Sequence, residues 1–263
     1  PPFAVRPSPM QGLGVFATRV IPAGTRLCEY GGERLTPAEA EARSMQLNLR
    51  AVKPLNETQV RILDAAEELF MQHGFEGTSM RLLTAKAGVN LAAVNYHFGS
   101  KDGLLEALFA LRATPIAEER VRLLDEAEKK AAGAPKLEDI LDAFVRPALT
   151  MGSQRSGGPA FGRLRARLAT EPETLSRKIL SNAFDASSHR FIDAIARALP
   201  HLPRAEVEWR FHFMLGAMYY TMANSGRIQA LTGGRCDPGD VRRALRHMIP
   251  FLAAGFRSPQ RPI

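Results

Sequence analysis

The sequence predicts an all-α protein that carries a short β-rich appendage at its N-terminal end. Three observations support this fold class. From residue 57 onward nearly every segment has helical periodicity, and no strand signal follows. Gly and Pro residues interrupt the pattern at intervals that suit a bundle of about nine helices. Residues 1–44, in contrast, are rich in Gly and Pro and contain short runs of β-forming residues.

The first zone, residues 1–44, predicts two short strands and the start of one helix. The strands are expected at residues 14–17 and 27–30, with a turn at residues 21–24 between them. Thr36 can cap a short helix that has Pro37 at its first position. Residues 45–56 have the texture of a linker.

Helices are expected along the rest of the chain. The first begins near residue 57 and presents the apolar stripe Ile62, Ala66, Leu69 and Phe70 before Gly74 ends it. Short helices follow at about 79–87 and 91–97, and a long one runs from Lys101 to about Lys130. Further helices are expected at about 137–151, 159–170, 173–199, 204–231 and 238–257.

The charge balance points to a polyanionic partner. The chain has 263 residues, a formal net charge of +8 and an isoelectric point near 9.9. This balance favours nucleic acid first and an anionic membrane surface second, with an arginine-rich solvated surface as the alternative. No run of about 18 apolar residues occurs, so no membrane helix is expected. The two cysteines match no metal spacing, which predicts free thiols in the cytoplasm and neither a metal nor a cofactor.

Residues 78–98 have the pattern of a helix-turn-helix. Thr78 is expected to cap the first short helix, Gly88 to form the tight turn, and Asn90 to cap the second. Two short helices joined by a Gly-containing turn are the arrangement that enters the DNA major groove. The alternative is a plain helical bundle that happens to contain short helices.

The second short helix offers small and polar side chains for DNA. Ala92 and Ala93 can contact thymine methyl groups, and Asn95 can pair with adenine. The remaining candidates for DNA contact, mostly to phosphates, are Thr78, Arg81, Lys86, Asn90, Tyr96, His97 and Lys101. Two alternatives stay open, because Asn90 is favoured as a helix cap and the ring of Tyr96 can be partly buried.

The run from Thr58 through Leu104 resembles the head of the TetR family, through Ala87-Gly88-Val89, residues 94–98 and Ser100-Lys101. Leu82 departs from the family, which often has an acidic residue there. The resemblance implies a helix-turn-helix domain at 57–104 and a ligand and dimerisation domain at 105–257. It implies a transcriptional repressor rather than an enzyme, binding a palindromic double-stranded operator as a homodimer and released by a small-molecule inducer.

In that family the last two long helices form the dimer. Here they would be residues 204–231 and 238–257. Candidates for the apolar seam are Met214, Leu215, Met218, Met248, Phe251 and Leu252. The alternative is that this stripe packs inside one monomer, which periodicity cannot distinguish.

Within the family, the chain resembles regulators that respond to fatty acids or fatty acyl-CoA, through the head and through residues 209–217 and 248–255. That resemblance implies an apolar tunnel for a long acyl chain. Candidate lining residues are Phe144, Phe161, Leu164, Leu168, Phe184, Phe191, Trp209, Phe213 and Tyr220, each with simple core packing as its alternative.

His212 is favoured as a hydrogen-bonded core histidine. Arg163, Arg165 and Arg167 could meet a carboxylate or CoA phosphate, with a solvated face as the default.

Residues 3–43 resemble the opening of a SET-type lysine methyltransferase, through residues 12–17, 21–25 and 29–33. In that family the first Gly-x-Gly approaches S-adenosylmethionine. The later cofactor and tyrosine motifs are missing, and about 40 residues are too few to bury a core. We therefore expect a truncated segment that does not bind S-adenosylmethionine, with Met45 as a candidate natural start. A methyltransferase fragment remains the alternative function.

Overall fold

The computed structural model describes residues 3–7, 13–17, 55–131, 134–150, 158–170 and 174–259. Backbone contacts divide the chain into two units, Pro1–Val52 and Lys53–Ile263. In the first unit, strands β1 (Phe3–Pro7) and β2 (Leu13–Ala17) pair in antiparallel register, with Phe3 opposite Ala17. β2 covers the strand predicted at 14–17. The segments predicted at 21–24, 27–30 and from Thr36 lie outside the described residues, and the β-rich appendage as a whole stays an unsupported prediction.

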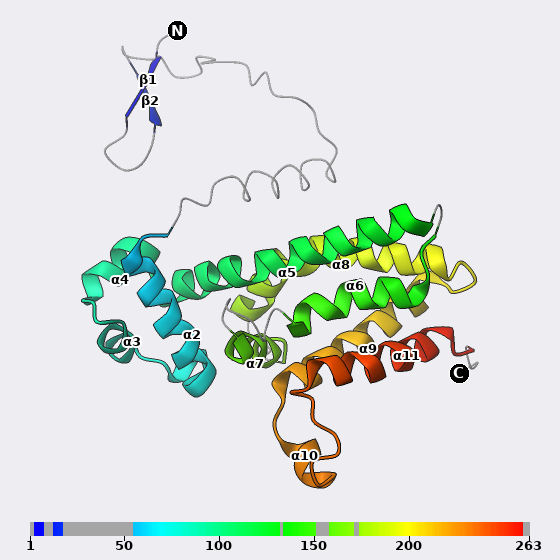
Figure 1. The fold of residues 1–263 in the computed structure, drawn as a ribbon. Coiled ribbons are helices and arrows are strands. Elements are labelled where there is room, and N and C mark those ends of the chain that lie inside the picture. The colour runs from blue at the N-terminus through cyan, green and yellow to red at the C-terminus, as the bar shows by residue number, and fades with distance from the viewer. Residues whose placement is uncertain are drawn as a thin grey trace. The chain divides into compact units, whose positions relative to one another are not determined.

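The second unit is all-helical over its described residues, as predicted (Figure 1). Its ten described helices are α2 (Glu57–Gly77), α3 (Met80–Ala87), α4 (Leu91–Phe98), α5 (Lys101–Ala131), α6 (Leu137–Thr150), α7 (Gly158–Leu168), α8 (Thr174–Ala198), α9 (Arg204–Ala223), α10 (Arg227–Leu231) and α11 (Val241–Arg257).

The local sequence explains where these helices begin and end. Asn56 and Gln59 form a capping box at the start of α2, with Asn56 Oδ1 accepting from the Gln59 amide at 2.8 Å. The single helix predicted at 204–231 is instead two helices. Asn224 has a φ of 39° and Gly226 a φ of 75°, and these left-handed residues separate α9 from α10. Asn is among the few residues other than Gly that adopt this conformation at low cost.

Two hydrophobic clusters organise the helical unit. The first cluster joins α2, α3 and α4 to the first half of α5, to α7 and to the start of α8, and includes Ile62, Leu83, Val94 and Phe161. The second joins α6, α9 and α11 to the later parts of α5 and α8. α5 and α8 pack against each other and contribute to both clusters (Figure 1). These two helices therefore connect the N-terminal head to the rest of the bundle.

Two searches of the described residues found no candidates. None of the described helices combines the length and the apolar character that crossing a membrane requires. No group of His, Cys, Asp and Glu side chains among the described residues is arranged to hold a metal ion.

Candidate nucleic-acid interface

The turn between α3 and α4 has the predicted construction. Gly88 ends α3 with a φ of 63°, a left-handed conformation that favours glycine. Asn90 then caps α4, and its Oδ1 accepts a hydrogen bond from the Ala93 amide at 2.8 Å. The predictions for Gly88 and for the Asn90 cap are confirmed. The side chain of Asn90 is therefore committed to its own helix.

The prediction for Thr78 is wrong, both as a helix cap and as a DNA contact through its side chain. Ser79 caps α3 instead, because its Oγ accepts from the Leu82 amide at 3.2 Å. Thr78 is buried, and its hydroxyl lies 2.8 Å from the Gly74 carbonyl and 3.2 Å from that of Leu69. The hydroxyl thus closes the end of α2, where the chain kinks at Gly74, and is not available at the surface.

α4 presents its polar side outward because Val94, helped by the partly buried Phe98, anchors its other side. Val94 is completely buried in the first hydrophobic cluster. Ala92, Asn95 and Tyr96 are consequently exposed, and Ala93 is half-buried. The side chain of Tyr96 is 85% exposed, so the alternative of a partly buried ring is wrong. This arrangement gives α4 a short face of small and polar groups beside an aromatic hydroxyl.

The basic side chains around α4 differ in whether they contact other side chains of the head. Arg81 is exposed on α3. Lys86 Nζ pairs with Glu68 on α2 at 2.8 Å, and this contact lowers the pKa of the Glu68 carboxyl. Lys101 Nζ lies 4.3 Å from the centre of the Phe75 ring. Lys86 and Lys101 therefore fasten neighbouring helices together, a role that sequence reasoning did not assign to them.

Two further exposed groups lie beside the turn and were missed from the sequence. Arg61 on α2 approaches Gly88, since its Nη1 would lie 4.0 Å from a Cβ at that residue. Leu91 is half exposed at the start of α4. Arg61 lies on the polar side of α2, opposite the apolar stripe. That position alone could not show that the turn comes close to it.

The predicted ligand residues fall into two groups. One group is buried inside the body, the region in which the apolar tunnel was predicted: Phe144, Phe161, Leu164 and Phe184. Trp209 and Phe213 are instead 60% and 63% exposed on α9, with their rings stacked 5.9 Å apart. The prediction that these two line an internal tunnel is wrong. The inward positions of α9 are taken by Val207, Phe211, Met214 and Met218.

His212 and the dimer seam also require correction. His212 is exposed between Trp209 and Phe213, so it is not a core histidine. Of the predicted seam, Met214, Met218 and Leu252 are buried within the monomer and cannot form an interface. Leu215 and Met248 are half-buried, and Phe251 is 70% exposed on α11. Tyr220 is likewise exposed on α9.

The three arginines of α7 do not all lie on a solvated face, which was the default expectation for them. Arg163 is half-buried and Arg167 is exposed. Arg165 is buried, and its guanidinium lies 4.0 Å from the centre of the Phe184 ring. Two further buried arginines, Arg120 of α5 and Arg210 of α9, were not identified from the sequence.

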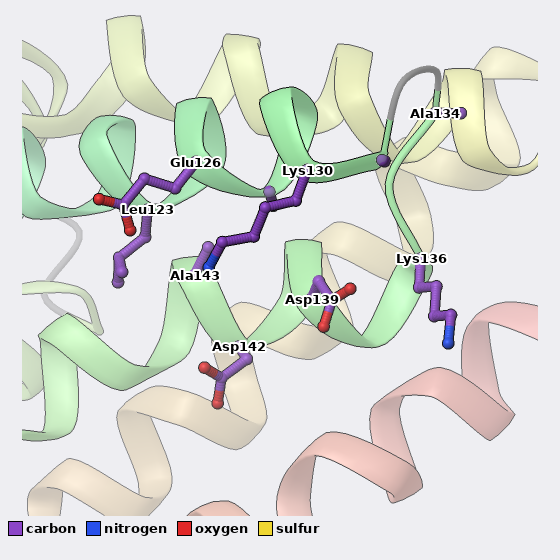
Figure 2. Close-up of a pocket in the computed structure, with 10 residues that line it drawn as sticks. Leu123, Glu126, Lys130, Ala134, Lys136, Asp139, Asp142 and Ala143 are labelled. Atoms are coloured by element: carbon purple, nitrogen blue, oxygen red, sulfur yellow. The ribbon is translucent and has the colours of Figure 1, made fainter.

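Two open grooves of the body carry several charged side chains and include none of these residues. One, of about 480 Å³, is bounded by the C-terminal part of α5 and by α6, with Lys130, Asp139 and Asp142 around it (Figure 2). Another, of about 710 Å³, runs between α6 and α11 and includes Arg146 and Arg246. Neither groove is lined by a predicted ligand residue. Their charged linings do not suit a long acyl chain.

Comparisons with known proteins agree on one type of protein. Residues 62–108 match the family model described as bacterial regulatory proteins, tetR family. Residues 142–255 match the model described as tetracyclin repressor-like, C-terminal domain.

Among curated relatives, the chain is 28% identical over 186 residues to the HTH-type transcriptional regulatory protein RaaS of Mycobacterium tuberculosis, covering 71% of this chain and 76% of RaaS. It is 39% identical over 66 residues to the HTH-type transcriptional repressor AcnR of Corynebacterium glutamicum, covering 25% of this chain and 35% of AcnR. It is 45% identical over 51 residues to the probable HTH-type transcriptional regulator YttP of Bacillus subtilis, covering 19% of this chain and 25% of YttP. The matches to AcnR and YttP thus span only about a third and a quarter of those proteins.

Solved structures share the fold. The fatty acid degradation regulator FadR of Bacillus halodurans superposes with a TM-score of 0.53 at 15% identity, over 79% of this chain and 100% of FadR. The regulator PfmR of Thermus thermophilus gives a TM-score of 0.51 at 20% identity, over 76% of this chain and 100% of PfmR. At these identities the similarity extends to the arrangement of helices alone.

Proposed function

The chain belongs to the TetR family of bacterial transcriptional regulators, and we propose that it is a ligand-responsive repressor that binds a palindromic operator as a homodimer. The observation that carries this proposal is the geometry of α4. Val94 anchors the helix while Ala92, Asn95 and Tyr96 are exposed next to a glycine turn. The proposed role is regulatory rather than catalytic, and we place it in the cytoplasm, where operator DNA is found.

We assign the DNA contacts by the chemistry of each exposed group. Ala92 and Ala93 would meet thymine methyl groups, and Asn95 would pair bidentately with adenine. Groups that would bind phosphates and position the head are Tyr96, His97, Arg81 and Arg61. Lys86 and Lys101 are secondary candidates, because each would have to leave a partner within the head, Glu68 or Phe75, to reach DNA.

Selection of binding sites from random duplexes by the full chain tests the reading function. We expect an enriched palindrome with half-sites about one helical turn apart, near 34–36 Å. Asn95→Ala should relax the preference at one position of each half-site. The control Asn182→Ala, an exposed asparagine on α8, should not. Recovery of no palindrome would overturn the proposal.

The homodimer is proposed from exposed aromatic side chains. Trp209, Phe213 and Tyr220 lie exposed on α9, and Phe251 lies exposed on α11. Large apolar groups grouped on a surface are typical of an interface, and aromatic residues often contribute most to its binding energy. Trp209→Glu is expected to produce monomers in sedimentation velocity, whereas Ala186→Glu on α8 should leave dimers. Dimers that persist at micromolar concentration in Trp209→Glu would exclude this face.

We further propose that the inducer is a fatty acid or a fatty acyl-CoA. The support is the resemblance to regulators of this kind, the shared fold with FadR, and the buried apolar residues Phe144, Phe161, Leu164 and Phe184. Ligand and operator would oppose each other through linkage. Titrating acyl-CoA and free fatty acids into the protein–operator complex tests this, and the proposal fails if no acyl species weakens binding. The methyltransferase alternative finds no support in these similarities.

A further inference from the structure

Three arginines are buried among the described residues, and two of them lack the carboxylate partner that Arg210 has in Glu206. Arg120 on α5 is 0% exposed and Arg165 on α7 is 1% exposed. Arginine keeps its proton under all ordinary conditions, so both side chains carry a full positive charge into the protein interior. Burial of a charge is costly unless an opposite charge and hydrogen bonds compensate for it. A buried arginine is therefore expected to have a carboxylate partner.

The described residues do not supply that partner. Arg120 Nε donates to the Phe144 carbonyl at 2.8 Å, and its Nη2 lies 3.5 Å from the sulfur of Met218. Among the described residues, Arg120 Nη1 and both Nε and Nη1 of Arg165 have no hydrogen-bond partner. No carboxylate of the described residues forms an ion pair with either guanidinium. Three strong donors are thus left unsatisfied in one interior region.

Aromatic rings hold the two guanidiniums in the same region. Arg120 Cζ lies 3.7 Å from the centre of the Phe144 ring and 5.5 Å from that of Phe184. Arg165 Cζ lies 4.0 Å from the same Phe184 ring and 5.3 Å from the ring of Tyr219. Contact with ring faces attracts a cation but offers no acceptor for its N–H groups. Both guanidiniums therefore lie beside the ring of Phe184, and each keeps at least one N–H donor without an acceptor among the described residues.

The two charges also oppose each other. Burial lowers the pKa of Arg120 well below its ordinary value, and the positive charge of Arg165 lowers it further. An anion placed between the guanidiniums would relieve both effects, because it attracts each cation and accepts the unsatisfied hydrogen bonds. A carboxylate fits these donors, since its two oxygens together accept about four hydrogen bonds.

We propose that Arg120 and Arg165 bind the carboxylate of the inducer, and that the inducer is a free carboxylic acid with an apolar body. This inference rests on the proposed ligand-responsive function. The rings of Phe144, Phe184 and Tyr219 and the thioether of Met218 enclose the apolar part next to the carboxylate. A fatty acid meets these requirements. Its acyl-CoA does not, because the thioester replaces the carboxylate that the arginines would bind.

The location of the pair gives the ligand a route to the head. Phe184 belongs to the hydrophobic cluster that includes α2, α3 and α4, whereas Phe144 and Met218 belong to the second cluster. The arginines therefore lie where the two clusters meet. α7 carries Arg165 toward this point, and two residues later it carries Arg167, which lies against Gly74 of α2. A carboxylate that draws Arg165 toward Arg120 would act on the same helix that contacts the head.

Calorimetric titration of the full chain tests the assignment with three probes of equal chain length: decanoate, decan-1-ol and decanoyl-CoA. We expect decanoate to bind about 10- to 100-fold more tightly than the alcohol, as charge-assisted hydrogen bonds predict. Arg120→Met and Arg165→Met keep the side-chain bulk and remove the charge, so each should abolish this preference. Arg163→Met, a half-buried neighbour on α7, should retain it. Equal binding of acid and alcohol by the natural chain, or no binding of decanoate, would overturn the proposal.

Thermal unfolding without ligand distinguishes a binding role from a purely structural one. If no anion compensates Arg120 and Arg165 in the ligand-free protein, the Met variants should unfold at the same or a higher temperature than the natural chain. Each variant removes a buried charge that has no partner. If another part of the chain already neutralises the arginines, the Met variants should unfold at a lower temperature and leave the acid preference unchanged, which would overturn the proposal. Operator binding is measured separately. If the natural chain binds no operator but binds decanoate through Arg120 and Arg165, the repressor function is refuted and this inference stands.

Discussion

The guanidinium of Arg167 on α7 lies directly against Gly74 on α2 and occupies the space that a Cβ at residue 74 would need. Gly74 has a φ of 75° and a ψ of 171°, a combination that is open almost only to glycine. The backbone conformation therefore disfavours any side chain at residue 74, and a Cβ there would also displace the guanidinium of Arg167.

Gly74→Ala should lower the free energy of unfolding by about 1–3 kcal/mol, which is the usual cost of forcing a side chain into such a conformation. Chemical denaturation followed by circular dichroism measures the loss. Gly77→Ala is the matched control, because Gly77 ends the same helix without a positive φ and its nearest neighbour is an ordinary 3.5 Å contact. Equal stability of the two variants would contradict the role given to Gly74.

Thr78→Val should lower the free energy of unfolding by about 1–3 kcal/mol, because the carbonyls of Leu69 and Gly74 lose a buried donor. Thr78→Ser keeps the hydroxyl and should recover most of the loss. Site selection with Thr78→Val should return the same operator sequence as the natural chain. A changed base preference at unchanged stability would instead restore Thr78 as a DNA contact.

Tyr96→Phe should weaken operator and non-operator binding by similar factors, because a phosphate contact carries no sequence information. Fluorescence anisotropy with both duplexes at several salt concentrations measures the effect. The exposed position of Tyr96 predicts no loss of folding stability. Affinities that match the natural chain on both duplexes would remove Tyr96 from the interface.

Glu67 should make folding stability depend on pH. Its side chain is buried, Oε2 accepts from Arg112 Nε at 2.9 Å, and Oε1 has no partner among the described residues. Burial raises the pKa of Glu67 above its ordinary 4.5 more than Arg112 lowers it. The native state then holds this proton more tightly than the unfolded state. The stabilising contribution is therefore complete below pH 4.5 and is lost as the pH rises through the raised pKa.

Urea denaturation of the natural chain and of Glu67→Gln between pH 4.5 and pH 7.5 measures this dependence. The glutamine variant cannot titrate at residue 67, so groups common to both proteins cancel in the difference. The free energy of unfolding of the natural chain, relative to that of Glu67→Gln, should decrease as the pH rises. A constant difference, or one that moves the other way, would show that Arg112 dominates burial.

The sequence was sufficient wherever one short stretch determines the structure. The Gly88 turn, the Asn90 cap, the end of α3 and the start of α4 follow from residues within a few positions of one another. The error at Thr78 arose because Thr78 and Ser79 are both good capping residues, and no local rule decides between adjacent positions. Only the fold-back of the chain at Gly74 places one hydroxyl inside and the other at the helix end.

Positions that depend on distant helices could not be predicted in the same way. Trp209, Phe211 and Phe213 follow one another so closely that the apolar residues of α9 define no single face. Which of them point inward depends on the helices packed against α9. Arg120 lies in a long helix rich in exposed charges, where a solvated side chain is the normal expectation. Its burial becomes visible only when α6, α8 and α9 surround it.

The shared hydrophobic cluster limits how this protein could be recombined with its relatives. Ile62, Leu83 and Val94 of the head pack in the same cluster as Phe109 and Phe161 of the body. A head excised at residue 104 would leave part of its own interior behind. A graft onto another regulator should therefore succeed only if the first half of α5, α7 and the start of α8 are transferred with it. In this chain the exchangeable module is larger than the DNA-reading motif.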